Sequence, residues 1–196
     1  MSKFKIALVL VACVAAGAVD AQTNVRVRGT ITSIDGNVMA VKSRDGRDLK
    51  LALPDNVSVA VAKAIRFEDI KKGDYVGATT VLGADGTLTA LEVHYLPPTV
   101  PDGHIPWDLQ PGSMMTNANV GSIVTGTGKR QLTLHYKDGS QTIAVPESAA
   151  LVRAEPGTRA DLKPGEYIFA GAQVGADGMM TAPRIQVSKD GVRPPQ

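Results

Sequence analysis

The sequence lacks the residues on which several classes of function depend. Its one cysteine, Cys13, lies in an apolar N-terminal run, so the rest of the chain excludes disulfides, thiolate catalysis and cysteine-based zinc sites. Aromatic residues make up 4% of the chain, too few for the stacking platforms that bind single-stranded nucleic acid. The formal net charge of +2 is too small for a field that captures nucleic acid or anionic lipid. We therefore expect no nucleic-acid partner.

Long apolar runs are also missing, apart from one near the N-terminus. Residues 1–21 combine a basic start, an apolar stretch and small residues at the −3 and −1 positions before Gln22, which predicts a cleaved signal peptide. The stretch is shorter than the roughly 20 residues of a spanning helix. We therefore expect an exported, periplasmic protein with no transmembrane segment in the mature chain. Residues 10–13 also fit a lipobox, and the alternative is a lipoprotein anchored through Cys13.

What is present is an internal repeat. The motif Asp-Ile-Lys-Lys-Gly-Asp-Tyr-Val that begins at Asp69 returns as Asp-Leu-Lys-Pro-Gly-Glu-Tyr-Ile from Asp161, an offset of 92. The same offset places Gly29 on Gly121, Ile31 on Ile123, Pro54 on Pro146 and Gly83-Ala-Asp-Gly on Gly175-Ala-Asp-Gly. So many matches at one spacing indicate an internal duplication.

Each copy has the pattern of β structure. Val25, Val27 and Ile31 alternate with polar residues, as in a half-buried strand. Asp-Gly pairs follow at intervals and predict hairpin turns in which both central residues have positive φ. Residues 67–72 can form one helical turn before the last hairpin. Several short strands within some 70 residues favour a small closed barrel with an OB-like strand order.

The predicted fold class is all-β, with two tandem small OB-like β-barrels that are related by internal duplication and joined by a Pro-rich linker. The expected boundaries are residues 24–97 for the first domain, 98–117 for the linker, 118–190 for the second domain and 191–196 for a tail.

The repeated Asp-Leu/Ile-Lys-x-Gly-Asp/Glu-Tyr motif is interpreted as structural. Gly73 and Gly165 are expected to adopt a left-handed turn, and Tyr75 and Tyr167 to enter the core or its rim.

The tandem pattern and the linker motif from Gly103 to Asn117, GHIPWDLQPGSMMTN, resemble a bacterial family of exported, tandem OB-like β-domains of unknown function. Members with a similar linker often carry the label "metal ABC transporter permease". A permease needs several spanning helices, for which this sequence has no apolar runs. The resemblance covers essentially the whole mature chain and implies the fold and export.

The linker and its flanks hold the candidate ligand-binding residues Trp107, Tyr95 and Asp108. A lone Trp between prolines either anchors a linker against the domains or lines a cleft between them, since domain junctions favour pockets.

A metal site is the alternative. His94, His104, Met114 and Met115 offer two imidazoles and two thioethers in one segment, a ligand set that suits copper, whereas histidines joined by carboxylates suit zinc. In the competing interpretation, His94 is a strand residue, the Met pair packs between the barrels and His104 faces solvent.

The sequence contains none of the hydrolase or phosphate-loop motifs Gly-x-Ser-x-Gly, His-Glu-x-x-His and Gly-x-x-x-x-Gly-Lys. We therefore predict a non-enzymatic, periplasmic binding or envelope-structural module. Its partner would be an envelope protein or a small ligand, without a cofactor. The alternative is a periplasmic copper-binding protein.

Overall fold

The computed structural model describes residues 23–196. The predicted signal peptide, its cleavage site and Cys13 lie outside these residues. The all-β prediction is confirmed, because regular structure consists of thirteen strands and two short 3₁₀ turns. No helix in residues 23–196 is long and apolar enough to cross a membrane.

Strands and turns follow the two repeats. The first repeat contains β1 (Thr23–Asp35), β2 (Val38–Ser43), β3 (Asp48–Ala52), β4 (Ser58–Ala64), η1 (Phe67–Asp69), β5 (Tyr75–Leu82) and β6 (Leu88–Tyr95). The linker contains β7 (Gly103–Pro106). The second repeat contains β8 (Met114–Gly126), β9 (Lys129–Tyr136), β10 (Gly139–Ala144), β11 (Ala150–Pro156), η2 (Arg159–Asp161), β12 (Tyr167–Val174) and β13 (Met180–Val187). From the 3₁₀ turn onward, corresponding elements begin at an offset of 92.

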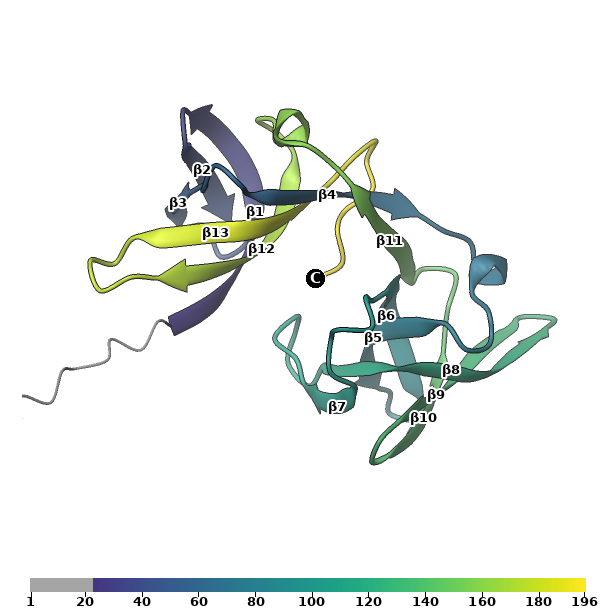
Figure 1. Ribbon diagram of the computed structural model, residues 1–196. Coiled ribbons are helices and arrows are strands. Elements are labelled where there is room, and N and C mark those ends of the chain that lie inside the picture. Colours follow the sequence, from purple (N-terminus) through teal and green to yellow (C-terminus); the bar gives the residue numbers. More distant parts are fainter. Residues whose placement is uncertain (1–22) are drawn as a thin grey trace, which may run out of the picture.

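Five strands form a closed, mixed β-barrel (Figure 1). Hydrogen-bonded neighbours run β5–β6, β6–β10, β10–β9, β9–β8 and β8–β5, and only β6–β10 is parallel. Completely buried side chains fill its interior, among them Val93, Leu132, Leu134 and Ile143. We call this unit the barrel lobe.

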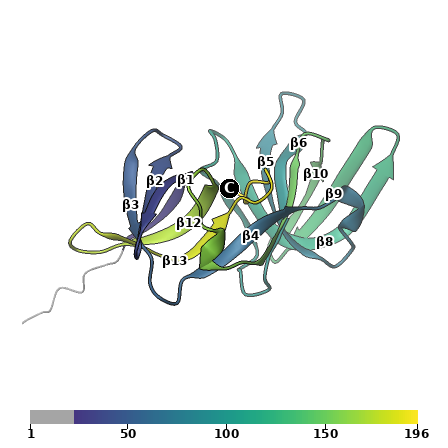
Figure 2. The same ribbon diagram turned by 90° about the horizontal axis from the view of Figure 1, so that it is seen from above.

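Eight further strands complete the sheet. Five of them pair in the order β1–β2, β2–β3, β3–β13, β13–β12 and β12–β1, and only β3–β13 is parallel. This order matches that of the closed barrel, with β1 in the place of β8. We call these five strands the β1 lobe. Its own cluster of buried residues includes Ile31, Met39, Leu51, Ile168 and Ile185. Figure 2 shows the two lobes side by side.

Each lobe combines strands from both repeats. The β1 lobe takes β1 to β3 from the first repeat and β12–β13 from the second, whereas the barrel lobe takes β5–β6 from the first and β8 to β10 from the second. The expected boundaries 24–97 and 118–190 therefore mark the repeats and not the two clusters of buried residues. The expectation that each repeat closes on itself differs from the observed pairing, because the repeats exchange their last hairpins.

The exchange depends on β4 and β11, which carry the chain from one lobe to the other (Figure 2). They pair with each other in antiparallel fashion, and the register places Ala62 opposite Ala154, its own counterpart at offset 92. β4 then pairs in parallel with β13, and β11 with β6. The connection that follows the third strand in each repeat is therefore an extended arm, and the two arms meet on a pseudo-two-fold axis.

The first strands of the two repeats correspond at a different offset from the one expected. The backbone of Ile31 bonds to Gly165 and Glu166, and the backbone of Val120 bonds in the same way to Gly73 and Asp74. Val120 is therefore the counterpart of Ile31, at an offset of 89, and the expected matches of Ile31 with Ile123 and of Gly29 with Gly121 are wrong. Backbone pairing with the exchanged hairpin sets this register, and it outweighs the similarity of isolated residues.

The predicted left-handed turn of the repeated motif is confirmed, whereas the predicted hairpin turns with two positive φ values are not formed at the two Asp-Gly pairs of the first hairpins. Gly73 and Gly165 both have φ of +92°, so the left-handed turn is confirmed. Gly36 and Gly46 also have positive φ, but the aspartates before them do not, because Asp190 is the one non-glycine residue of positive φ in residues 23–196. The expected turns with two positive φ values are therefore not formed at those two glycines.

Candidate binding site at the junction of the two lobes

Trp107 follows β7 and ties the linker to the β1 lobe and to the tail. Its indole Nε1 donates a hydrogen bond of 2.7 Å to the backbone oxygen of Gln196. The guanidinium of Arg26, on β1, lies 4.1 Å from the centre of the indole ring. A cation over an indole face is a favourable contact. The half-buried Trp107 thus anchors the linker between the lobes and also lines a cavity there.

Asp108 is held by the arginines of β1. Its carboxylate accepts two hydrogen bonds from Arg28, of 2.8 and 3.1 Å, and lies 3.7 Å from Arg26. The hydrogen bond from Arg28, followed by the charges of Arg28 and Arg26, lowers the pKa of Asp108, while partial burial acts in the opposite direction. Arg28 is only 5% exposed. The alternating pattern of β1 had suggested a polar face in solvent, and this buried arginine was therefore missed.

His94 and Met115 line the same cavity of about 150 Å³ as Trp107, between the lobes. His94 is buried, and its Nδ1 has no hydrogen-bond partner within residues 23–196. Burial lowers the pKa of His94 to about 4, because desolvation disfavours the charged imidazolium. His94 is therefore neutral at physiological pH. The ring fits because it lies against Gly77 of β5, where a Cβ atom would lie 2.7 Å from His94 Nε2.

His104 and Met114 lie on the opposite face from Met115. Neighbouring residues of a strand point to opposite faces, and β7 pairs with β8 so that His104 is opposite Thr116. His104 Nδ1 lies 2.8 Å from the hydroxyl of Thr116, and its ring stacks on Tyr136 with 6.1 Å between centroids. The four residues of the copper hypothesis therefore do not share one face of the sheet, and only His94 and Met115 line a common cavity.

No group of three or more His, Cys, Asp or Glu residues that could hold a metal ion occurs in the part of the chain that the structure describes. Partial burial lowers the pKa of His104.

Tyr95 lies at the end of β6, at the rim of a separate pocket of about 620 Å³ that Trp107 does not line. Its hydroxyl is 2.9 Å from the carboxylate of Asp74 and 3.0 Å from the backbone oxygen of Asp69. The guanidinium of Arg153 lies 5.0 Å from the ring centre. Tyr95 therefore braces η1 and β5 in the barrel lobe, and the structure does not bring it together with Trp107 and Asp108.

Glu92 is a buried acid that no pattern in the sequence singles out. Its carboxylate accepts hydrogen bonds of 3.0 and 3.1 Å from the backbone nitrogen of Gln196 and one of 2.9 Å from Thr79. Burial raises its pKa to about 7, although the bonds from Gln196 and Thr79 and the charge of Arg28 act in the opposite direction. Figure 1 marks the C-terminal end between the lobes, where Gln196 connects Glu92 to Trp107. Gln196 therefore contacts both the barrel lobe, through Glu92, and the linker, through Trp107.

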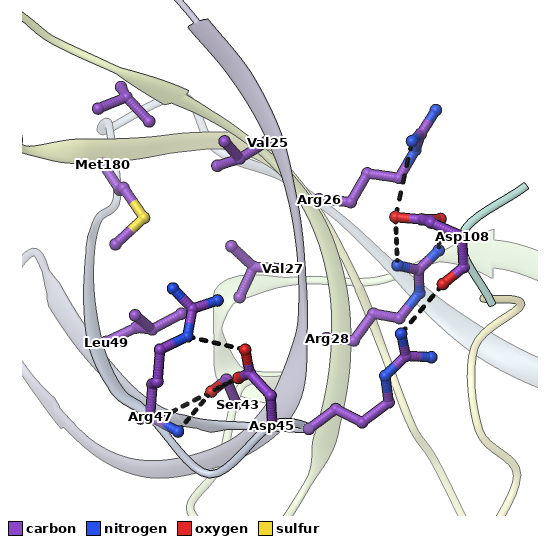
Figure 3. Close-up of a pocket in the computed structure, with 12 residues that line it drawn as sticks. Val25, Arg26, Val27, Arg28, Ser43, Asp45, Arg47, Leu49, Asp108 and Met180 are labelled. Atoms are coloured by element: carbon purple, nitrogen blue, oxygen red, sulfur yellow. Dashed lines mark hydrogen bonds and ion pairs between the residues drawn. The ribbon is translucent and has the colours of Figure 1, made fainter. Parts of the chain in front are cut away.

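A pocket of about 370 Å³ opens beside β1, and four arginines and two aspartates are among its lining residues (Figure 3). Arg26, Arg28 and Asp108 lie on one side of the β1 ribbon, and Val25 and Val27 lie on the other (Figure 3). The remaining lining residues are Ser43, Arg44, Asp45, Arg47, Leu49, Val174 and Met180. The pocket therefore combines guanidinium groups with an apolar wall.

Two of its four arginines have their own carboxylate. Arg28 pairs with Asp108 and Arg47 with Asp45, both at 2.8 Å. Arg44 instead donates to the backbone oxygens of Asp108 and Leu109. Arg26 reaches only the outer edge of Asp108, at 3.7 Å, and its side chain is 44% exposed. This arrangement can bind an anionic group next to an apolar one.

Comparisons with known proteins add no assignment: no family model, no curated protein and no solved structure matches this chain.

Proposed function

We propose that this chain is a non-enzymatic binding module of the bacterial envelope, exported to the periplasm, in which a duplicated sequence builds two OB-like barrels. The β1 lobe would be the second barrel, since its strands repeat the order of pairings of the closed one. The ligand site is the arginine pocket beside β1.

One observation carries the proposal. Arg26 and Arg44 present guanidinium groups without a carboxylate of their own, at the entrance of a pocket whose other wall is formed by Val25, Leu49 and Met180. Guanidinium groups bind carboxylates and phosphates through directed hydrogen bonds. A ligand with an anionic group beside an apolar one fits both walls.

The test is a calorimetric titration of the protein, purified from the periplasm after expression of the full chain, with inorganic phosphate, acetate and a hexaglutamate peptide. We expect hexaglutamate to bind, and the Arg26→Ala/Arg44→Ala variant to bind it at least tenfold more weakly. A matched control, Lys72→Ala/Lys163→Ala, removes the same charge from exposed positions outside the pocket and should stay within twofold of the parent. Equal losses in both variants would mean that net charge and not the pocket binds the anion.

A further inference from the structure

The two lobes differ at one strand edge. In the barrel lobe, residues 114–117 of β8 pair with β5 on one side and with β7 on the other. At the offset of 89, their counterparts are residues 25–28 of β1. These residues pair with β12, whereas the pairing of β1 with β2 begins only at Gly29. Within residues 23–196, no strand covers the second edge of β1 at these positions.

The direction of the free backbone groups follows from the hydrogen bonds that are made. Arg28 accepts a bond from the backbone nitrogen of Arg44, on the β2 side of the strand, while Ile31 bonds to the loop before β12. Successive residues of a strand direct their N–H and C=O groups to alternate edges. Arg26 and Asn24 therefore point their N–H and C=O groups to the uncovered edge.

The chain itself shows what fits such an edge. β7 lies antiparallel to β8 with Ile105 opposite Met115, and the backbone nitrogen of Trp107 continues the ladder to the oxygen of Ser113. Met115 is the counterpart of Arg26. His104, the residue before Ile105 on β7, lies against Thr116 and Tyr136 at the mouth of the barrel.

Within residues 23–196, the corresponding mouth of the β1 lobe is a pocket. Gly29 pairs with Ser43 on β2. The counterpart of Gly29 is Ala118, and extending the β8–β9 register by one residue beyond the pair Asn119–His135 places Tyr136 opposite Ala118. Ser43 is therefore the counterpart of Tyr136. Val27 replaces Thr116 by the same offset. A large ring is thus replaced by a small side chain, and the pocket of about 370 Å³ lies there between Val25, Val27 and Met180.

We propose that the free edge of β1 receives an extended segment of a partner polypeptide as an added antiparallel strand, in the way that β8 receives β7. This proposal rests on the proposed function and specifies its ligand. Alternate side chains of the added strand would enter the apolar mouth and approach Arg26 and Arg44, so the segment carries an apolar or aromatic residue next to an acidic one. Strand addition of this kind takes its affinity from backbone hydrogen bonds and its specificity from alternate side chains.

A second copy of this chain is a poorer occupant. Two β1 edges laid antiparallel would bring Arg26 and Arg28 of one copy beside the same arginines of the other, and like charges on neighbouring strands are destabilising. A strand with an acidic residue removes that repulsion.

The probe is a synthetic peptide that copies residues 102–108 of this chain with Ile105→Glu, added to the isotope-labelled protein purified from the periplasm. We expect amide exchange, followed by NMR, to slow at least tenfold at Arg26 upon binding. The same peptide N-methylated at position 105 should bind at least tenfold more weakly, because it cannot donate the central ladder bond. Arg26→Pro removes both the guanidinium and the N–H on the free edge, whereas Arg26→Ala removes the guanidinium alone. Arg26→Pro should therefore bind the peptide at least tenfold more weakly than Arg26→Ala.

Several results would overturn the added strand. Peptide binding without slower exchange would mean that only side chains bind the acid, which leaves the arginine pocket as the ligand site. Failure of the peptide to bind while hexaglutamate still binds has the same meaning. Slow exchange at Arg26 before peptide is added would show that the edge is already covered, by another part of the same chain if it is independent of protein concentration and by a second copy if it rises with concentration. If Arg26→Pro does not fold, the N-methylated peptide still decides the question.

Discussion

The barrel lobe and the β1 lobe use the same strand order and finish one edge differently. In the barrel lobe, the linker strand β7 covers β8, and His104 lies at the mouth against Tyr136. In the β1 lobe, the backbone N–H and C=O groups of Arg26 point to an edge that no strand of residues 23–196 covers. The small side chain of Ser43 lines a pocket at the mouth of this lobe. A duplicated unit can therefore keep one copy closed by its own chain and leave the other available. The linker is what distinguishes the copies.

The lobes differ again where they face each other. In the barrel lobe, Gly77 lies between His94 and Asn117 in the sheet. The corresponding row of the β1 lobe has Phe169 between Gln186 and Arg28. The middle position of the row is therefore a glycine in the barrel lobe and a phenylalanine in the β1 lobe.

Charge also differs between the two copies. Glu92 of β6 corresponds to Arg184 of β13, and Met115 of β8 to Arg26 of β1. The acid buried in the barrel lobe therefore faces a β1 lobe that is rich in arginine, and Arg28 contributes to the pKa of Glu92 through its charge.

The largest expected effect is the change in the pH dependence of stability when either Glu92 or His94 is replaced. With a pKa of about 7 in the folded state against 4.5 ordinarily, Glu92 reduces the free energy of unfolding by about 3 kcal/mol as pH rises from 4.5 to 7. With a pKa of about 4 against 6.5, His94 increases it by about 3 kcal/mol as pH rises from 4 to 6.5. The two changes oppose each other in the parent protein.

Glu92→Gln should therefore make the protein more stable as pH rises from 4 to 6.5, and His94→Gln should make it less stable as pH rises from 4.5 to 7. Urea unfolding of both variants and the parent at four pH values across this range checks the signs. Parallel profiles for the two variants would mean that neither group is titrating in the folded protein as described.

Gly77→Ala tests the packing difference between the rows. The added Cβ would lie 2.7 Å from His94 Nε2, and overpacking of this kind costs about 2 kcal/mol. Gly171→Ala is the matched control on β12, since nothing lies within 4 Å of its Cβ position. Urea unfolding should show a loss for the first variant and a change below about 0.5 kcal/mol for the second. Equal changes would show that His94 moves aside without cost.

Asp108→Asn should lower the free energy of unfolding by about 1 to 2 kcal/mol. It leaves the buried Arg28 without its counter-charge, and the effect is reduced because the side chain of Asp108 is 49% exposed. The lowered pKa of Asp108 means that its contribution is present above its ordinary pKa of 3.8 and is lost as pH falls through the folded value. The parent and the variant should therefore converge in stability on acidification, which thermal unfolding at pH 7 and pH 3 would measure.

His104→Ala should have the smallest effect, below about 1 kcal/mol, because it removes one hydrogen bond to Thr116 and a partly exposed ring. It would make the mouth of the barrel lobe resemble that of the β1 lobe. If the loss reached 3 kcal/mol, His104 would be a structural support of the barrel and the comparison of the two mouths would fail. Thermal unfolding next to Lys137→Ala, an exposed neighbour, provides the measurement and its control.

Two of the residues selected from the sequence lie close together in the structure. Trp107 and Asp108 were selected from the linker alone, and the structure places them together at β1. Arg28 could not be selected, because an arginine alternating with valines on a strand has the pattern of a solvent-facing residue. Its burial depends on a linker that lies 80 residues away in the chain. Glu92 was missed for the same reason, since its partner Gln196 lies 104 residues away.

The sequence by itself determined the duplication, the β structure and the turn glycines, because each depends on neighbours along the chain. Alternation specifies strands, and the left-handed φ of Gly73 and Gly165 follows from the residue type at a turn. Only the tertiary structure decided which hairpin closes which lobe. Two similar repeats offer similar strand edges to their own last hairpin and to that of the other repeat, so local pattern does not distinguish the two arrangements. The pairing of the extended strands β4 and β11 around Ala62 and Ala154 sends each hairpin to the opposite lobe.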